Sequence, residues 1–147
     1  METEYLSFVR LMNEENVDYV ILGGHAVIAH GFLRTTGDVD IFVRPSVENA
    51  KRLLTVMNRY GYTDDEFELD DFTRIPSYLS FSRHDGYIDV MTFTQGVTFD
   101  ECYQNRLVLD IHGTPVSFIN LRELIKNKRA VGRPQDLRDI ENLPDPN

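Results

Sequence analysis

Residues 18–43 read DYVILGGHAVIAHGFLRTTGDVDIFV, and the order of residue types in this stretch predicts the centre of the fold. The bulky apolar run Val20–Leu22, bounded by turn residues, indicates a buried strand. Gly23-Gly24 lets the backbone turn sharply and approach a ligand closely. Residues 25–30 then predict a short helix that ends at a glycine, and residues 39–43 predict a second strand.

Two aspartates, Asp38 and Asp40, stand two residues apart at the head of the second strand. Alternate residues of a strand share a face, so their carboxylates converge, roughly 6–7 Å apart along the backbone. Such a pair repels unless a cation lies between them, and oxygen ligands suit Mg²⁺ or Mn²⁺. A lone Asp-x-Asp is more often a solvated strand edge, and a lone Gly-Gly is more often a turn. Their succession here favours an anion site beside a metal site.

Composition bounds the class of protein. The chain has 147 residues, of which 41% are hydrophobic, and this predicts one globular domain over residues 1–147. It lacks a run of about 18 apolar residues, so we expect no membrane span. The single cysteine, Cys102, and an acidic N-terminus without a signal-peptide pattern predict a cytoplasmic protein. A net charge of −9 excludes a bulk, sequence-blind nucleic-acid binder, but a local basic patch could hold a nucleic-acid end.

Hydrophobic periodicity predicts further elements around this centre. Residues 3–15 and 47–57 carry apolar side chains at helical spacing, and Ser46 and Gly61 are typical start and stop signals for the second helix. Residues 64–71 hold six acids in eight positions, which indicates a solvated loop or, alternatively, a face for a basic partner. Other elements are predicted over residues 79–83, 87–93, 107–111, 115–119, 120–129 and 134–143. The expected fold class is α/β (α+β), a mixed β-sheet flanked by helices.

Asp89 interrupts the predicted strand 87–93, which is otherwise β-rich and largely apolar. A carboxylate in a central strand costs free energy unless it is paired or bound to a cation. Its two interpretations are an edge position facing water and a third metal ligand.

These positions resemble the polymerase-β-type nucleotidyltransferase superfamily, and more narrowly its small minimal members and relatives in toxin–antitoxin and abortive-infection systems. The superfamily pattern is a strand, Gly-Gly or Gly-Ser, a helix, Asp-x-Asp on the next strand and a third carboxylate on a later strand. Here those positions are Gly23, Gly24, Asp38, Asp40 and Asp89. Many active relatives have a serine after the first glycine, and its hydroxyl helps to hold the triphosphate. At Gly24, backbone N–H groups alone would do this.

The polar turn before Asp38 adds candidate phosphate contacts. Arg34, Thr35 and Thr36 offer a positive charge and hydroxyl groups. The resemblance therefore implies that the nucleotide is bound by Gly23 and Gly24 together with Arg34 and Thr36.

Basic residues gather in the predicted C-terminal helical segment, residues 120–143, of an otherwise acidic chain. They are Lys126, Lys128, Arg129, Arg133 and Arg138. One interpretation is a solvated helix face, and the other is contact with a triphosphate or an RNA end. The segment also resembles a block of toxin-related members in which a lysine and a downstream aspartate accompany the metal carboxylates. On that resemblance Lys128 binds the nucleotide and Asp136 assists.

The resemblance implies a metal-dependent nucleotidyltransferase. Asp38, Asp40 and Asp89 would bind Mg²⁺ or Mn²⁺, and an acceptor hydroxyl would attack the α-phosphorus of an NTP and release pyrophosphate. The acceptor could be a protein, a tRNA end or a small molecule. In so short a chain, a cognate toxin or antitoxin or a second copy could complete the cleft. The competing hypotheses are a catalytically weak nucleotide-binding or antitoxin-like module, and a structural domain with a chance Asp-x-Asp.

Overall fold

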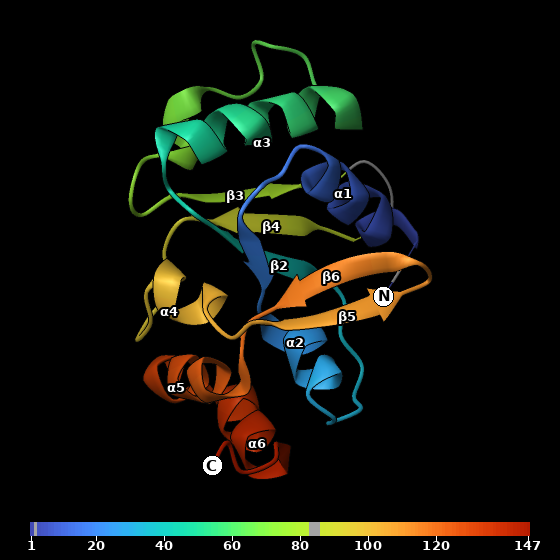
Figure 1. Ribbon diagram of the computed structural model, residues 1–147. Helices are drawn as coiled ribbons and strands as arrows, with labels where there is room; N and C mark the ends of the chain where they lie inside the picture. Colours follow the sequence, from blue (N-terminus) through green and yellow to red (C-terminus); the bar gives the residue numbers. More distant parts are fainter. Residues whose placement is uncertain (2, 83–85) are drawn as a thin grey trace.

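A six-stranded mixed sheet forms the centre of the computed structural model, which describes residues 1, 3–82 and 86–147 (Figure 1). The strand order is β3-β4-β2-β1-β6-β5. The strands are β1 (Tyr19–Ile21), β2 (Val39–Val43), β3 (Tyr78–Phe81), β4 (Ile88–Met91), β5 (Leu107–Ile111) and β6 (Thr114–Phe118). β2 pairs in parallel with β4 and β1 with β6, whereas the other neighbours are antiparallel. The predicted α+β class with a mixed sheet is confirmed.

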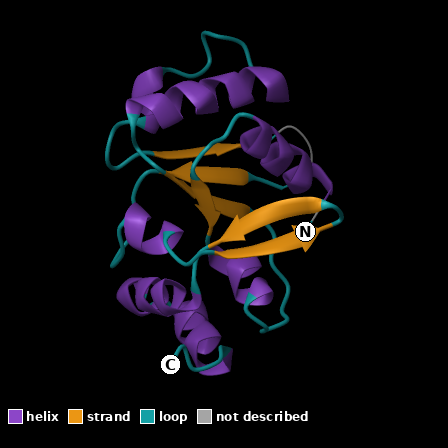
Figure 2. Ribbon diagram, in the orientation of Figure 1, coloured by secondary structure: helices purple, strands orange, loops and turns teal. Residues whose placement is uncertain are grey.

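Helices cover both faces of this sheet, as the colouring by secondary structure in Figure 2 shows. They are α1 (Thr3–Glu14), α2 (Gly23–Ala29), α3 (Val47–Tyr60), the 3₁₀ helix η1 (Leu69–Phe72), α4 (Phe99–Tyr103), α5 (Leu121–Val131) and α6 (Pro134–Asn142). α1 and α3 pack together on one side, and α5 and α6 pack together on the side of α2 (Figure 1). The glycine pair and the aspartates therefore lie on the face that α2, α5 and α6 share.

The local signals in the sequence explain where α3 begins and ends. The Ser46 side chain accepts a hydrogen bond from the Asn49 N–H, as an N-cap does, and Gly61 ends the helix in the left-handed conformation. Between them, Ala50, Leu53 and Met57 are buried and place the helix against the core. These boundaries confirm the prediction from the caps.

Three features differ from the sequence-based expectations. α2 begins at Gly23, two residues early, because Gly23 adopts a left-handed φ of 62° that turns the chain straight from β1 into the helix. α4 was not predicted, although Thr98 and Glu101 form a capping box at its start. The predicted acidic loop contains η1. The turn expected at residues 84–86 lies mostly outside the described residues.

The length and composition of the helices also bear on whether the chain could cross a membrane. Within the described part of the chain, no helix combines the length and the apolar character that a membrane crossing requires.

Candidate active site

The candidate site is a row of residues across one face of the sheet. Asp40 of β2 stands opposite Asp89 of β4, and Asp89 stands opposite Ser80 of β3. Cross-strand partners project from the same face. Gly23 extends the row on the other side of β2, because a Cβ atom at Gly23 would overlap the Asp40 carboxylate. Gly23, Asp40, Asp89 and Ser80 thus form one line, which we call the carboxylate row.

Two carboxylates in this row are direct cross-strand neighbours that interact, those of Asp40 and Asp89. Burial raises the pKa of Asp40 to about 6, with further increases from the charge of Asp89, a hydrogen bond with Asp89 and the charge of Asp38. Positive charge at Arg133 acts in the opposite direction. The Ser80 hydroxyl donates to Asp89 Oδ1 at 2.5 Å, which fixes the orientation of that carboxylate. Asp89 is therefore placed beside Asp40 and not on a solvated edge of the sheet.

Asp38 lies at the mouth of the site. Its exposed side chain accepts a hydrogen bond from the Tyr87 N–H at 3.1 Å, at the start of β4. In the described residues, no group of three or more His, Cys, Asp or Glu side chains is close enough together to hold a metal ion. The Asp40–Asp89 pair nevertheless has the chemistry of a cation site, because two neighbouring carboxylates repel each other and a cation bound between them would relieve that repulsion.

The second glycine of the pair is in contact with the polar turn. A Cβ atom at Gly24 would overlap the Thr36 hydroxyl and would lie 3.2 Å from Arg34 Nη1. The Thr36 hydroxyl therefore occupies the space that a side chain at position 24 would fill. Gly24, Thr36 and Arg34 together form a corner at the start of α2.

A buried ionic cluster holds this corner against the C-terminal helices. Arg34 donates two hydrogen bonds to Asp139 of α6, at 2.8 and 2.9 Å. Lys128 of α5 pairs with Asp139 at 2.9 Å and with Asp136 at 3.0 Å. Arg133, at the corner between α5 and α6, donates to Asp136 at 2.8 Å. The cluster thus connects Arg34, beside Gly24, to Arg133, whose charge acts on Asp40.

Hydrogen bonds from basic residues, acting against burial, keep the aspartates of the cluster ionised. Asp136, Asp139 and Lys128 are 1%, 0% and 4% exposed. Burial alone would raise the pKa of Asp136, but hydrogen bonds from Arg133 and Lys128 hold it below its ordinary value. The pKa of Asp139 is likewise lowered against the effect of burial, by Arg34, Lys128 and Gln135. Both aspartates are therefore ionised at neutral pH.

The C-terminal basic residues do not form one patch. The interpretation as a solvated helix face is wrong for Lys128, whose ammonium is inside the cluster. Lys126 pairs instead with Glu101 and Glu123 on the other side of α5. Helix periodicity separates these two lysines, since residues two apart point to different sides.

The structure adds residues that the sequence did not single out as part of the site. Ser80 contacts Asp89, and Asp139 joins Arg34 to Lys128. For Arg133, already one of the candidate basic residues, the structure adds that its charge acts on Asp40. The alternation of Tyr78–Phe81 could have placed Ser80 on the exposed face of a strand, but the strand register was required to set it opposite Asp89. The single cysteine, Cys102, is buried away from this site, and burial raises the pKa of its thiol to about 12.

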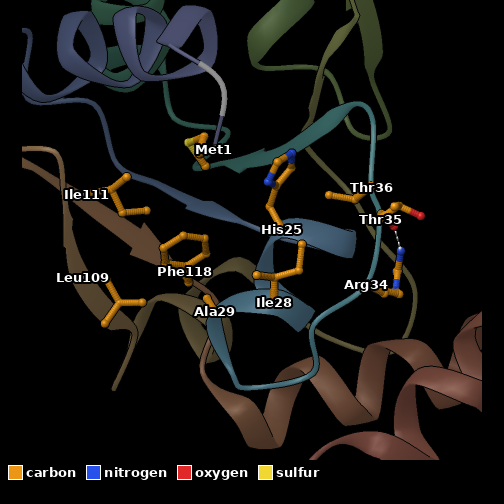
Figure 3. A pocket seen from close by; sticks show the side chains of 10 residues that line it. All are labelled: Met1, His25, Ile28, Ala29, Arg34, Thr35, Thr36, Leu109, Ile111 and Phe118. Atoms are coloured by element: carbon orange, nitrogen blue, oxygen red, sulfur yellow. Dashed lines mark hydrogen bonds between the residues drawn. The ribbon is translucent and has the colours of Figure 1, made fainter.

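A separate cavity of about 510 Å³ lies along α2 (Figure 3). Ile28 and Phe118 line its apolar part, and Arg34 and Thr36 line the opposite wall. The corner that touches Gly24 therefore also borders this cavity.

Comparisons with known proteins agree with this architecture. The model of a family described as "Nucleotidyltransferase of unknown function (DUF6036)" matches residues 5–143. No curated protein matches the sequence significantly.

Three solved structures share the fold at low sequence identity. The lincosamide antibiotic adenylyltransferase LnuA, lincomycin-bound, has a TM-score of 0.63 and 17% identity over 97% of this chain and 95% of its own. A putative nucleotidyltransferase from Thermotoga maritima has a TM-score of 0.66 and 13% identity, over 96% and 92%. An antigenic nucleotidyltransferase-like protein from Paracoccidioides brasiliensis has a TM-score of 0.56 and 20% identity, over 93% and 72%.

Proposed function

The chain belongs to the nucleotidyltransferase family DUF6036, and we propose that it transfers a nucleoside monophosphate from an NTP to a hydroxyl acceptor at the carboxylate row. The observation that carries the proposal is the contact between the Asp40 and Asp89 carboxylates, next to a glycine backbone that comes close to Asp40. Neighbouring carboxylates repel each other and so destabilise the fold, but together they can bind the divalent cations that phosphoryl transfer uses.

The donor set suits a divalent cation. Asp40 and Asp89 would hold Mg²⁺ or Mn²⁺ together with Asp38, which would turn away from the Tyr87 N–H. Because the Asp38 side chain is exposed, this rotation costs little. When bound, the ion would neutralise the negative charge on the transferring phosphoryl group.

The phosphate end of the nucleotide is assigned to the corner at the start of α2. Gly23 and Gly24 leave room for the backbone to approach phosphate oxygens, and Thr36 places a hydroxyl where a serine side chain at position 24 would lie. Arg34 adds a guanidinium next to that hydroxyl. We infer that Thr36 replaces the missing serine hydroxyl in holding the triphosphate.

The transfer step follows from the position of Asp89. The acceptor oxygen attacks the α-phosphorus, the bond from that phosphorus to the bridging oxygen breaks, and pyrophosphate leaves on the side of Gly24. Asp89 takes the proton of the acceptor hydroxyl. Ser80 keeps the Asp89 carboxylate directed at that hydroxyl through its 2.5 Å hydrogen bond.

Lys128 and Asp136 act indirectly in this proposal. Their charges are consumed by ion pairs in the cluster, so they position Arg34 and Arg133 and do not reach the nucleotide themselves. Arg133, whose side chain is 73% exposed, is then available to a phosphate near Asp40.

The identity of the acceptor and of any partner rests on indirect support. LnuA, whose chain is matched over nearly its whole length, is an adenylyltransferase with an antibiotic bound, so a chain of this size suffices for a small acceptor. A cytoplasmic toxin–antitoxin pair remains the proposed setting for a protein or tRNA acceptor, with the partner or a second copy completing the cleft.

The test is transfer of label from each α-³²P-labelled NTP in turn, with Mg²⁺ or Mn²⁺. The acceptors are the protein itself, total tRNA, cell lysate and its small-molecule fraction. We expect label in one acceptor class with the wild type and none with Asp40→Asn. Glu48→Gln, which removes an exposed carboxylate on α3, is the matched control and should retain transfer. Absence of label with every NTP would refute transfer.

One observation favours the nucleotide-binding or antitoxin-like module as a second candidate. Asp38 accepts a hydrogen bond from a backbone N–H, and within the described residues it does not join Asp40 and Asp89 in a group of three side chains close enough to hold a metal ion. This alternative predicts metal-dependent NTP binding by equilibrium dialysis together with no label transfer.

A further inference from the structure

A second row of side chains runs parallel to the carboxylate row, two residues further along each strand or back from it. Phe42 of β2 stands opposite Met91 of β4, and Met91 stands opposite Tyr78 of β3. Each lies two residues from its neighbour in the carboxylate row, and therefore on the same face of the sheet. An apolar row thus lies directly beside Asp40, Asp89 and Ser80.

This apolar row is covered at one end and open at the other. Phe42 is buried beneath Phe99 of α4, with ring centroids 5.3 Å apart. Met91 is half-buried, and Tyr78, on the edge strand β3, is 61% exposed. A cavity of about 220 Å³ is lined by Tyr78 and Met91 together with the two carboxylates Asp40 and Asp89. We call Tyr78, Met91 and the Ser80 hydroxyl that donates to Asp89 the acceptor shelf.

The order of the strands indicates from which side the acceptor reaches the site. Gly23 and Gly24 lie on the β1 side of Asp40, whereas Asp89 and the acceptor shelf lie on the β4 and β3 side. In an in-line displacement the acceptor approaches from the side opposite to the leaving pyrophosphate. If the phosphate end lies at Gly24, the acceptor must therefore arrive over β4 and β3. This step rests on the proposed function.

We propose that the acceptor shelf binds the acceptor, and that the acceptor is a small, phosphate-free molecule that presents its hydroxyl on a ring, such as a sugar or a phenol. The 220 Å³ cavity suits one ring and is below the 300–1,000 Å³ typical for a whole drug-sized ligand. The Tyr78 ring offers a face for stacking, and Met91 adapts to different shapes. Carboxylates at the shelf and a net charge of −9 oppose the phosphates of an RNA end.

The four methionines of the chain make the proposal directly measurable. Met91 is on the shelf, Met1 lines the separate cavity along α2, and Met12 and Met57 are buried in the core. The full-length protein with ¹³C-methyl methionine is titrated with 4-nitrophenyl β-D-glucopyranoside in the presence of Mg²⁺. We expect a saturable shift of the Met91 methyl signal and no shift of the other three.

Substitutions at Tyr78 test the stacking. Tyr78→Ala should raise the dissociation constant about five-fold or more, and Tyr78→Phe should keep it within about two-fold of the wild type. The control Val108→Ala removes an exposed apolar side chain from the opposite edge strand β5 and should leave the dissociation constant unchanged. A shift at Met1 alone, no shift at all, or equal binding by Tyr78→Ala would overturn the proposal.

Failure of this inference and failure of the proposed function give different results. Label transfer to tRNA or to a protein with an unchanged KM in Tyr78→Ala would overturn the acceptor shelf and leave nucleotidyl transfer intact. A Met91 shift with the glucoside, without label transfer from any NTP, would support the shelf as a binding site and refute transfer.

Discussion

Replacing Asp40 by asparagine should make the metal-free protein more stable at neutral pH while it abolishes transfer. Burial and the charge of Asp89 raise the pKa of Asp40 from 3.8 to about 6 in the folded state. A carboxyl group with a raised pKa in the folded protein stabilises it fully below the unfolded pKa. That contribution is lost as the pH rises through about 6. At pH 8 the ionised Asp40 therefore destabilises the fold, and a neutral side chain of the same shape relieves this.

The magnitude follows from the size of the pKa difference. A difference of about 2 units corresponds to about 3 kcal/mol at pH 8. Asp40 is only half-buried, so solvent screening reduces the gain to about 1–2 kcal/mol. For a chain of 147 residues this raises the melting temperature by about 3–6 °C.

The assay is urea unfolding of wild type and Asp40→Asn in EDTA at pH 4 and pH 8. The stability difference should be about 1–2 kcal/mol in favour of the variant at pH 8 and close to zero at pH 4. The control Glu48→Gln removes a surface ion pair with Arg52 and should lower stability by less than about 0.5 kcal/mol. A destabilised Asp40→Asn at pH 8, or a difference that does not change with pH, would refute the reasoning.

Three other perturbations test separate parts of the structure. Lys128→Met leaves Asp136 and Asp139 without their shared cation and should lower the free energy of unfolding in urea by about 3–5 kcal/mol. The control Lys126→Met, at an exposed ion pair, should lower it by less than about 1 kcal/mol. Equally small losses in the two variants would contradict the buried cluster. Gly24→Ala places a methyl group against Thr36 and should lower the free energy of unfolding by about 1–3 kcal/mol. Adding Thr36→Gly in a double variant should restore most of that loss. Additive losses would show that the two positions do not touch. The Cys102 thiol, buried and with its pKa raised to about 12, should fail to react with an aromatic disulfide reagent at pH 8 until urea unfolds the chain, and rapid reaction of the native protein would contradict its burial.

The central fold could be predicted because its signals are local. The strand over Val39–Val43 is bounded as predicted, and Ser46 and Gly61 mark the ends of α3 as expected. α4 has a local signal as well, but its five residues are too few to show helical periodicity. Short elements held by a capping box and one or two buried side chains are therefore the ones that pattern analysis omits.

The candidate site was only partly predictable, because its contacts depend on strand register and on helix packing. The sequence identifies Asp40 and Asp89 as unusual carboxylates, but only the parallel pairing of β2 and β4 sets them opposite each other. The sequence marks Lys128 as a candidate nucleotide-binding residue and does not single out Asp139. The burial of both could not be predicted, because it arises where α5 and α6 meet Arg34. Tyr78 belongs to no sequence motif, and it becomes a candidate only because the strand register places it opposite Met91.

The most direct test of the account compares two labels of the same nucleotide. Wild type, Asp40→Asn and Glu48→Gln are each incubated with Mg²⁺, the accepted NTP and its acceptor, and the NTP carries ³²P at either the α or the γ position. Nucleotidyl transfer predicts that the wild type and Glu48→Gln label the acceptor from the α position only, while the γ label appears in pyrophosphate, and that Asp40→Asn labels nothing. Acceptor labelled from the γ position, or equal α labelling by Asp40→Asn, would contradict it.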